Sequence, residues 1–272
     1  EEKELEILFP MIMMRLCLTL TLGTFQQQND PENEYLGISQ KPARELLERL
    51  QEVNPRYAHY LFRDACNMEA FPGSSEFLNW YKKAEGSFHS LLGEPLNPEN
   101  TVVLDLSIGS SLSAKMEGVS LEKQVEIMDS YLRENNAEIG VGKYAEARSF
   151  YSAKEFLNNS IDGEEKRTIH LGIDVFAPSG TSIYTPIDGV VHKLQDNQTE
   201  LDYGPTVILR HKITDGPEFY TLYGHLGREC LKQLEIGQVI KGGMQLTKIG
   251  NSNENGGWLP HVHFQLILDL FD

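Results

Sequence analysis

The chain has 272 residues, of which 40% are hydrophobic and 24% are charged. That length accommodates two compact units, or one domain with a substantial extension. The formal net charge of −16 excludes general binding to nucleic acids, whose phosphates would be repelled, and it argues against attraction to anionic membranes or wall polymers. The charge is uneven, because residues 166–272 carry 9 basic and 12 acidic side chains and the first 165 residues carry most of the excess.

The first expected element is a nearly apolar helix over residues 7–25. It follows an acidic start at residues 1–4, where a signal peptide needs positive charge, and it contains Pro10 and Arg15, which count against a membrane span. We therefore expect a buried amphipathic or core helix and no membrane partner. Polar residues 26–31 are expected to form a loop.

Residues 1–70 are predicted to be helical throughout. Apolar residues recur at three- and four-residue spacing around residues 46–53, after a helix start with Ser39 as N-cap and Pro42 in the first turn. Residues 71–165 are predicted to form a mixed α/β connector without a catalytic motif. It holds a strand over 101–108, a capped helix over 120–132 and an extended piece over 144–151.

From residue 166 the pattern changes to short β-runs separated by turns. The fold class expected is α+β, with helices at the N-terminus and an antiparallel β sandwich or barrel over residues 166–272. The expected strands cover residues 182–185, 189–194, 206–211, 218–223, 238–240, 245–249 and 261–268.

Five residues in this last region are candidates for a catalytic centre. They are His170 and Asp174 in His-Leu-Gly-Ile-Asp, His225 in Tyr-Gly-His-Leu, and His261 and His263. Histidine and aspartate are common zinc ligands, and catalytic zinc keeps three protein ligands and one water. Alternate residues of a strand share a face, so His261 and His263 can serve one centre. The set supplies three ligands and leaves two imidazoles for proton transfer.

Each of these patterns is weak by itself. Two histidines on one strand face are often polar surface, and His59, His89 and His211 lack any comparable context. The convergence of four histidines and one aspartate on three glycine-containing β contexts favours a hydrolytic metal centre. The scattered cysteines Cys17, Cys66 and Cys230 have neither disulfide-framework nor zinc-finger spacing, which indicates reduced thiols in the cytosol.

Residues 166–272 resemble the lysostaphin-type zinc metallopeptidases, a family of peptidoglycan and glycyl-glycine endopeptidases. The resemblance lies in the His170–Asp174 motif, the run from Ala177 to Val191, the Tyr203–His211 strand, the Tyr223–Leu226 loop and the closing Leu259–Gln265 signature. It implies a Zn²⁺ cofactor held by His170, Asp174 and His263, with His225 and His261 handling protons in either order. The implied substrate is a peptide or a peptidoglycan-type peptide. Residues 251–259 form a longer loop than is usual for the family, and Trp258 is a candidate for substrate contact.

The N-terminal part is similar to the last helices of a choline/aminoglycoside-phosphotransferase-like kinase, without that family's catalytic loop. The motifs are residues 8–17 and 33–39. The arrangement resembles bacterial kinase–metallopeptidase–class III aminotransferase fusions, which implies covalently linked neighbouring domains and a cytoplasmic parent. A wall hydrolase would instead act at the cell envelope. The alternative function is therefore a zinc-stabilised binding or scaffolding module, in which loss of His225 or His261 would leave function intact.

Overall fold

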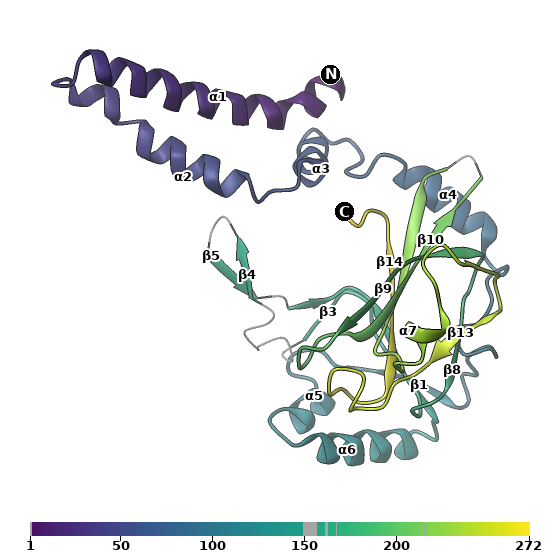
Figure 1. The fold of residues 1–272 in the computed structure, drawn as a ribbon. Coiled ribbons are helices and arrows are strands. Elements are labelled where there is room, and N and C mark those ends of the chain that lie inside the picture. Colours follow the sequence, from purple (N-terminus) through teal and green to yellow (C-terminus); the bar gives the residue numbers. More distant parts are fainter. Residues whose placement is uncertain (1, 149–156, 161–162, 167, 215) are drawn as a thin grey trace. The chain divides into compact units, whose positions relative to one another are not determined.

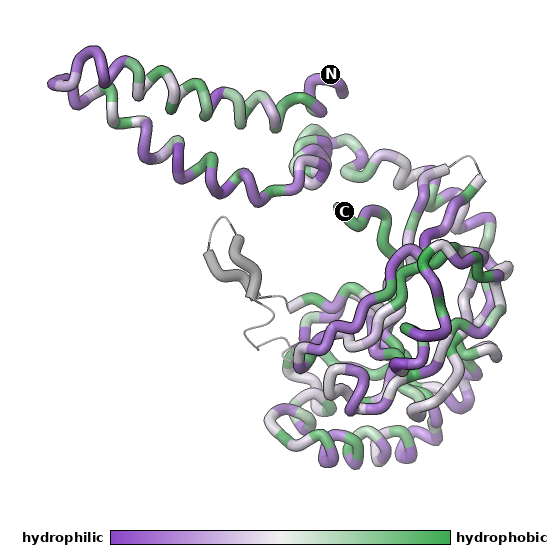
Figure 2. Tube along the Cα trace, viewed as in Figure 1, coloured by the Kyte–Doolittle hydropathy of each residue, from purple (hydrophilic) through white to green (hydrophobic). Residues whose placement is uncertain are grey.

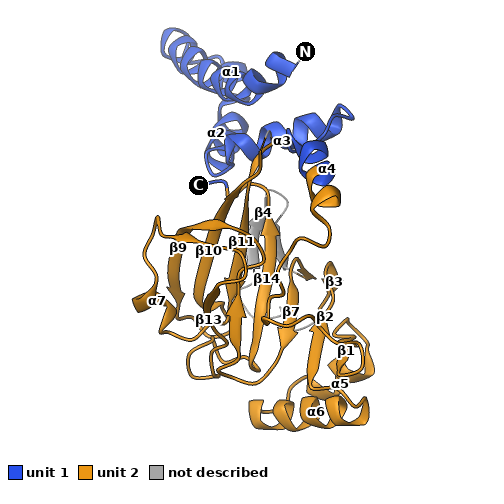
Figure 3. Ribbon diagram, turned by 90° about the vertical axis from the view of Figure 1, so that its right-hand side faces the viewer, with its two compact units in different colours: residues 1–79, 271–272 blue, residues 80–270 orange. Residues whose placement is uncertain are grey.

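A computed structural model describes residues 2–148, 157–160, 163–166, 168–214 and 216–272. The chain divides into two compact units (Figure 3). Unit 1 comprises Glu1–Asn79 together with Phe271–Asp272, and unit 2 comprises Trp80–Leu270. The extended piece expected over residues 144–151 falls partly outside the described residues, and the domain boundary at residues 165 and 166 stays a prediction.

Unit 1 is helical. The long helix α1 packs against α2 and α3. The last two residues of the chain belong to this unit, where Asn54 Nδ2 donates to the carbonyl of Phe271 and the Phe271 ring contacts the rings of Tyr57 and Tyr60. Its helices are α1 (Glu2–Asn29), the 3₁₀ helix η1 (Glu34–Gly37), α2 (Gln40–Leu50), α3 (Pro55–Ala65) and the first part of α4 (Ser74–Ala84).

The structure corrects two expectations for α1. The helix continues to Asn29, so most of the loop expected at residues 26–31 is helical. The expected burial is also wrong, because Phe9 and Gly23 are the buried residues of this helix. Hydrophobic residues nevertheless recur along much of its length (Figure 2). By length and composition α1 could cross a membrane. Signal sequences and the core helices of soluble proteins can have the same length and composition. Its exposed apolar residues are Ile7, Leu8, Met11, Met14, Leu18, Leu22 and Phe25.

Three helices begin with the expected capping chemistry, and α2 does not. The side chains of Asn54, Ser110 and Ser120 accept hydrogen bonds from backbone amides in the first turns of α3, α5 (Ser111–Met116) and α6 (Leu121–Glu134). Ser39 precedes α2 in a helical conformation, and its side chain makes no cap hydrogen bond. Pro42 lies in the first turn of α2 as expected, where its missing amide hydrogen costs nothing.

Unit 2 is built on an eight-stranded sheet, in which β1 and β2 run parallel and every other neighbouring pair is antiparallel (Figure 1). The fold class is thus mixed helix and sheet with a large antiparallel sheet, while closure into a sandwich or barrel stays a prediction. In spatial order the strands are β1 (Thr101–Leu104), β2 (Ile139–Gly142), β7 (Ile173–Phe176), β14 (His261–Ile267), β11 (Glu218–Gly224), β10 (Gly204–Lys212), β9 (Gly189–Asn197) and β12 (Val239–Ile240).

Among the described residues, unit 2 also contains three two-stranded sheets, the helices α5, α6 and α7, and the end of α4. The pair β3 (Glu146–Ala147) and β6 (Ile169–His170) adjoins the candidate site, since His170 lies on β6. The others are β8 (Ser182–Tyr184) with β13 (Gln245–Lys248), and β4 (Leu157–Ser160) with β5 (Gly163–Lys166). The short helix α7 spans Cys230–Gln233.

Two apolar clusters stabilise unit 2. The larger one joins the big sheet to β8, β13 and α7, with Leu209 and Tyr223 fully buried in it. The smaller one packs α5 and α6 against the β1 end of the sheet through residues such as Leu104 and Met128. Between them they hold β7 and β14, which contribute Val175, Phe176 and Val262 to the clusters. The strands that carry the candidate site are therefore fixed by core packing on both sides.

Candidate metal centre

The structure brings the five predicted site residues together from four places in unit 2. His170 lies on β6, Asp174 on β7, His261 and His263 on β14, and His225 directly after β11. The β-register sets these positions, because His263 is the direct cross-strand partner of both Asp174 and Gly224. All five side chains are buried. Their convergence thus follows from strand pairing between segments far apart in the sequence.

Three of the five offer donor atoms at the corners of a small triangle. His170 Nε2 lies 2.9 Å from His263 Nδ1 and 3.2 Å from Asp174 Oδ1, and the remaining side, between His263 Nδ1 and Asp174 Oδ1, is 3.0 Å. Tetrahedral zinc ligands at their usual bond lengths are separated by about 3.3 Å. Two imidazole nitrogens and one carboxylate oxygen at this spacing fit a catalytic zinc site, and among the described residues this is the group of three identified as able to hold a metal ion.

The two histidines of the triangle have their second nitrogens committed elsewhere. His170 Nδ1 is 3.3 Å from the carbonyl oxygen of Lys143, which can only accept, so the proton lies on Nδ1 and Nε2 faces the triangle. His263 Nε2 is 3.2 Å from Gln265 Oε1, which in the same way leaves Nδ1 for the metal. Such partners fix the tautomer and the ring orientation of a metal-binding histidine. Both rings are therefore set to present a lone pair to one point.

Gly172 serves the site by having no side chain. A Cβ at this position would lie 2.3 Å from Cε1 of His263, so the His263 ring occupies the space that any other residue would fill. Glycine at this position therefore permits close approach of the His263 ring to the backbone.

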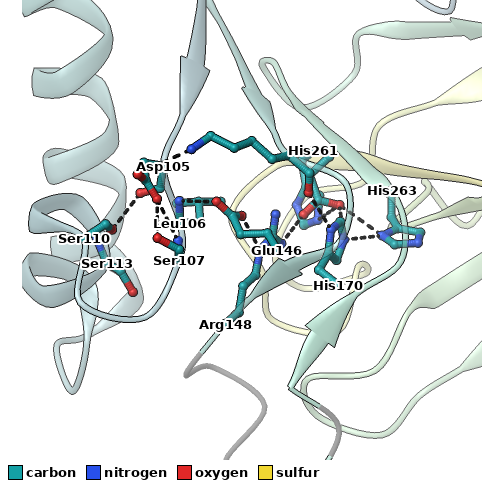
Figure 4. A network of polar contacts seen from close by, with 12 residues as sticks. Asp105, Leu106, Ser107, Ser110, Ser113, Glu146, Arg148, His170, His261 and His263 are labelled. Atoms are coloured by element: carbon teal, nitrogen blue, oxygen red, sulfur yellow. Dashed lines mark hydrogen bonds and ion pairs between the residues drawn. The ribbon is translucent and has the colours of Figure 1, made fainter.

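The carboxylate of Asp174 is held on its other side by a buried ion pair (Figure 4). Arg148 Nη1 donates to Asp174 Oδ2 at 2.5 Å, and Arg148 Nε donates to Glu146 Oε2 at 2.9 Å. Burial alone would raise the pKa of Asp174, but the neighbouring His261, His170 and His263 together hold that pKa well below its usual range. Asp174 is therefore a carboxylate at neutral pH, as a metal ligand must be.

His225 and His261 form a second pair beside the triangle, with ring centroids 4.3 Å apart. His225 Nδ1 donates to the carbonyl of Asn255 at 2.9 Å, and His261 Nδ1 donates to the carbonyl of Leu259 at 2.6 Å. Burial holds the pKa of His225 well below its usual value, with His261 acting in the same direction. Burial also lowers the pKa of His261 despite the nearby Asp174. Each ring is thus neutral, with an unprotonated Nε2.

The backbone at His225 is unusual. Its φ is +61°, a left-handed conformation that non-glycine residues rarely adopt. Two backbone hydrogen bonds hold it there, from the His225 amide to the Tyr203 carbonyl at 2.7 Å and from the Gly250 amide to the His225 carbonyl at 3.0 Å. Such outliers persist where the surroundings over-determine them, often at functional sites. The conformation points to a specific demand on where this side chain lies.

Two aromatic rings, those of Tyr203 and Trp258, flank His225. The Tyr203 ring lies 5.1 Å from the His263 ring and 5.6 Å from the His225 ring. Trp258 lies 6.0 Å from His225, and its indole nitrogen donates to the carbonyl of Asp202 at 3.1 Å. The structure thus places the predicted Trp258 beside a candidate proton-transfer residue. Sequence reasoning placed Tyr203 only in a strand.

Sequence reasoning also missed Gln265, Glu146 and Arg148. Gln265 could have been found, because it lies two residues beyond His263 and so on the same face of the strand. Glu146 and Arg148 are also two residues apart. A Glu-x-Arg sequence is common in an acidic chain, however, and does not by itself indicate a functional site. His211, which has no comparable motif context, is a buried histidine bonded on both nitrogens, to the Asp188 carbonyl at 2.8 Å and to Thr221 Oγ1 at 2.7 Å.

Residues 168–269 match the model of Peptidase family M23. The chain is 34% identical over 100 residues to the peptidoglycan DD-endopeptidase ShyC of Vibrio cholerae, covering 37% of this chain and 20% of that protein. It is 33% identical over 96 residues to an uncharacterized metalloprotease of Haemophilus influenzae, covering 35% of this chain and 18% of that protein. These matches support a zinc metalloendopeptidase in this part of the chain, which spans about a fifth of the length of those relatives.

Among solved structures, the catalytic domain of lysostaphin from Staphylococcus simulans is similar at 21% sequence identity. The likeness covers 38% of this chain and 71% of that chain, with a TM-score of 0.30. A TM-score of this size is too low to carry an argument about the site. The assignment of chemistry therefore depends on the sequence match and on the donor geometry.

Proposed function

We propose that unit 2 is a zinc-dependent endopeptidase that cleaves peptidoglycan-type or glycyl peptides. The observation that carries the proposal is the juxtaposition of the donor triangle with two neutral imidazoles whose Nε2 atoms are unprotonated. The triangle supplies two nitrogens and one oxygen within hydrogen-bonding distance of one another. His261 Nε2 lies 3.7 Å from Asp174 Oδ1, so His261 faces the same point, and the ring of His225 lies beside it with the two centroids 4.3 Å apart.

His170, Asp174 and His263 would hold the zinc ion. When bound, zinc lowers the pKa of a coordinated water toward neutrality and polarises a scissile carbonyl. The remaining requirement is a group that takes a proton from the attacking water and a group that returns one to the leaving amine. The protein must supply both, within reach of the donor triangle.

His225 and His261 meet this requirement at their Nε2 atoms. Because each Nδ1 is bonded to a carbonyl oxygen, Nε2 is the atom that gains or loses the proton, and neither ring has to change tautomer first. One ring can accept the proton of the water at Nε2 and, as an imidazolium, return that proton to the leaving amine, while the other ring, after taking a proton from solvent, can stabilise the oxyanion. The two roles can be exchanged without altering the geometry, so the structure favours neither order.

Substrate class is inferred from the surroundings of the site and from the relatives. Tyr203 and Trp258 flank the histidines and could pack against an extended peptide of small residues. Residues 166–272 carry 9 basic and 12 acidic side chains, so the part that holds the site is nearly neutral and would not strongly repel an anionic wall polymer. The relatives named as peptidoglycan DD-endopeptidases support a wall peptide and action at the cell envelope.

A second function is a zinc-stabilised binding or scaffolding module in a cytoplasmic fusion protein. The observation that favours it is in unit 1, whose α1 exposes apolar side chains such as Met14 and Leu18, as a helix from the end of a kinase lobe would without the rest of that lobe. In that case the donor triangle would be retained for stability. The histidines His225 and His261 would then be dispensable.

Turnover by the zinc-loaded chain on glycyl peptides, peptidoglycan fragments and small amides separates the two functions. We expect cleavage of a peptide in this set, and a loss of about 10²–10⁴-fold in kcat/KM in His225→Ala with zinc content unchanged. The matched control is His192→Ala, since His192 lies on β9 with its ring 5.0 Å from that of Tyr220. Zinc binding by the wild-type chain without cleavage of any substrate would contradict the peptidase and support the module.

A further inference from the structure

We propose that residues 142–148, the end of β2 through β3, form the outer shell of the metal site and that Arg148 is the positioning residue for Asp174. This inference depends on the metal site of the proposed function and extends it beyond the region that matches the peptidase family. The matched region begins at residue 168. The segment that we assign to the site precedes it in the sequence.

Arg148 decides which oxygen of Asp174 is available to a metal. Oδ1 faces His170 and His263 at 3.2 and 3.0 Å, whereas Oδ2 accepts from Arg148 Nη1 at 2.5 Å. A carboxylate held at one oxygen cannot rotate freely about its last bond. Arg148 therefore leaves Oδ1 free to face the donor triangle. Because the orientation of the carboxylate is fixed before a metal ion binds, metal binding does not have to restrict it.

Glu146 anchors Arg148 and offsets its charge. Its Oε2 accepts from Arg148 Nε at 2.9 Å, while its Oε1 accepts from the backbone amide of Leu106 at 2.9 Å (Figure 4). Both residues are 6% exposed, so their interaction is poorly screened by water. A guanidinium alone beside the donor triangle would repel a cation. Paired with Glu146 it acts as a hydrogen-bond donor that adds no net positive charge.

The start of the segment is shaped to admit this arrangement. A Cβ on Gly142 would lie 2.7 Å from Arg148 Nη2 and 3.4 Å from the Cβ of Asp174, so the guanidinium passes over the backbone at a position without a side chain. The next residue, Lys143, accepts the Nδ1 proton of His170 through its carbonyl. Since Glu146 is the cross-strand partner of His170, the segment contacts two of the three ligand residues.

The test uses the full chain and measures the dissociation constant for zinc by competition with a chromogenic chelator. We expect Arg148→Met to weaken zinc binding by about 10–100-fold, as for other partners of metal ligands, and Arg148→Lys to restore part of the loss. Arg210→Met is the matched control, because Arg210 forms a half-exposed ion pair with Glu218 on the sheet, and its affinity for zinc should equal that of the wild type.

Gly142→Ala guards against a variant that simply fails to fold. It displaces the guanidinium without removing any charged group, and the atom it meets is the end of a flexible side chain. We expect weaker zinc binding with little change in the melting temperature of the metal-free protein. A purely structural role for Arg148 would do the reverse, lowering that melting temperature while the folded protein kept its affinity.

Two results would overturn the inference. One is wild-type zinc affinity in folded Arg148→Met and Gly142→Ala variants, which would leave the metal site intact and remove only the outer shell. The other is a wild-type chain that binds no zinc, which would remove the metal site and the inference together. Because the measurement is affinity, a wild-type chain that binds zinc but cleaves no peptide would still test Arg148.

Discussion

The two units differ in the kind of side chain that they bury and expose. Unit 2 buries the five polar side chains of its site, and each of these side chains has at least one hydrogen-bond partner supplied by the sheet or its loops. Unit 1 leaves apolar side chains of α1 in contact with solvent. Strand register brings distant donors and acceptors together, so unit 2 can bury polar groups at low cost. The few helices of unit 1 bury less surface, and the candidate catalytic side chains lie in unit 2.

Equal truncations in the two units should give the largest contrast. Leu209 on β10 is fully buried, whereas Leu18 on α1 is 43% exposed. Leu209→Ala should lower the free energy of unfolding by about 2–5 kcal/mol, because it removes buried apolar surface and leaves a cavity. Leu18→Ala should change it by less than about 0.5 kcal/mol. Urea denaturation monitored by circular dichroism measures both.

A substantial loss of stability in Leu18→Ala would break this comparison. It would mean that the apolar face of α1 is covered in solution, for example by a second copy of the chain. Sedimentation of the wild type at several concentrations would then identify the association.

Zinc should stabilise one unit and not the other. At a free zinc concentration about 100-fold above its dissociation constant, the folded site should gain about 2.7 kcal/mol. Asp174→Ala should abolish that gain, because the donor triangle loses its oxygen. Differential scanning calorimetry with and without zinc measures the shift, and it should be confined to the transition of unit 2. An equal zinc-induced shift in Asp174→Ala would place the metal elsewhere.

Acid should also act mainly on unit 2. Burial lowers the pKa of His211 from 6.5, so the unfolded chain binds its proton more readily than the folded one. Stability from this group is therefore present above pH 6.5 and is lost as the pH falls below it. We expect the melting temperature of the metal-free protein to decrease over that range, and to decrease less in His211→Gln. Identical pH profiles for the two proteins would remove His211 as a contributor.

The sequence predicted the β-strands of unit 2 well where strands end at glycine, proline or polar turns. Expected strands at 189–194 and 218–223 correspond to Gly189–Asn197 and Glu218–Gly224, with differences of a few residues at the ends. The short strands that carry His170 and Asp174 were not predicted, because they are two and four residues long and contain no alternating pattern. Their conformation depends on pairing with β3, β2 and β14.

For the site, as for the strands, local motifs could be read from the sequence, whereas contacts between distant residues could not. All five candidate residues were identified from their types and local motifs. Arg148 was not, because its contact with Asp174 spans 26 residues and depends on the placement of β2 and β3 beside the other strands. The burial expected for α1 was wrong for a related reason. Apolar composition predicts burial only if the remaining chain provides a surface to cover it.

The pairing of β7 with β14 bears on whether the chain folds before or after it binds a metal ion. The two histidines of the donor triangle are 93 residues apart in sequence and meet only when these strands have paired across the middle of the sheet. An unfolded chain therefore has no preformed metal site, and the metal ion binds after the chain has folded. If the polypeptide is delivered unfolded to another compartment, the metal supply of the destination, not that of the site of synthesis, determines which ion it acquires.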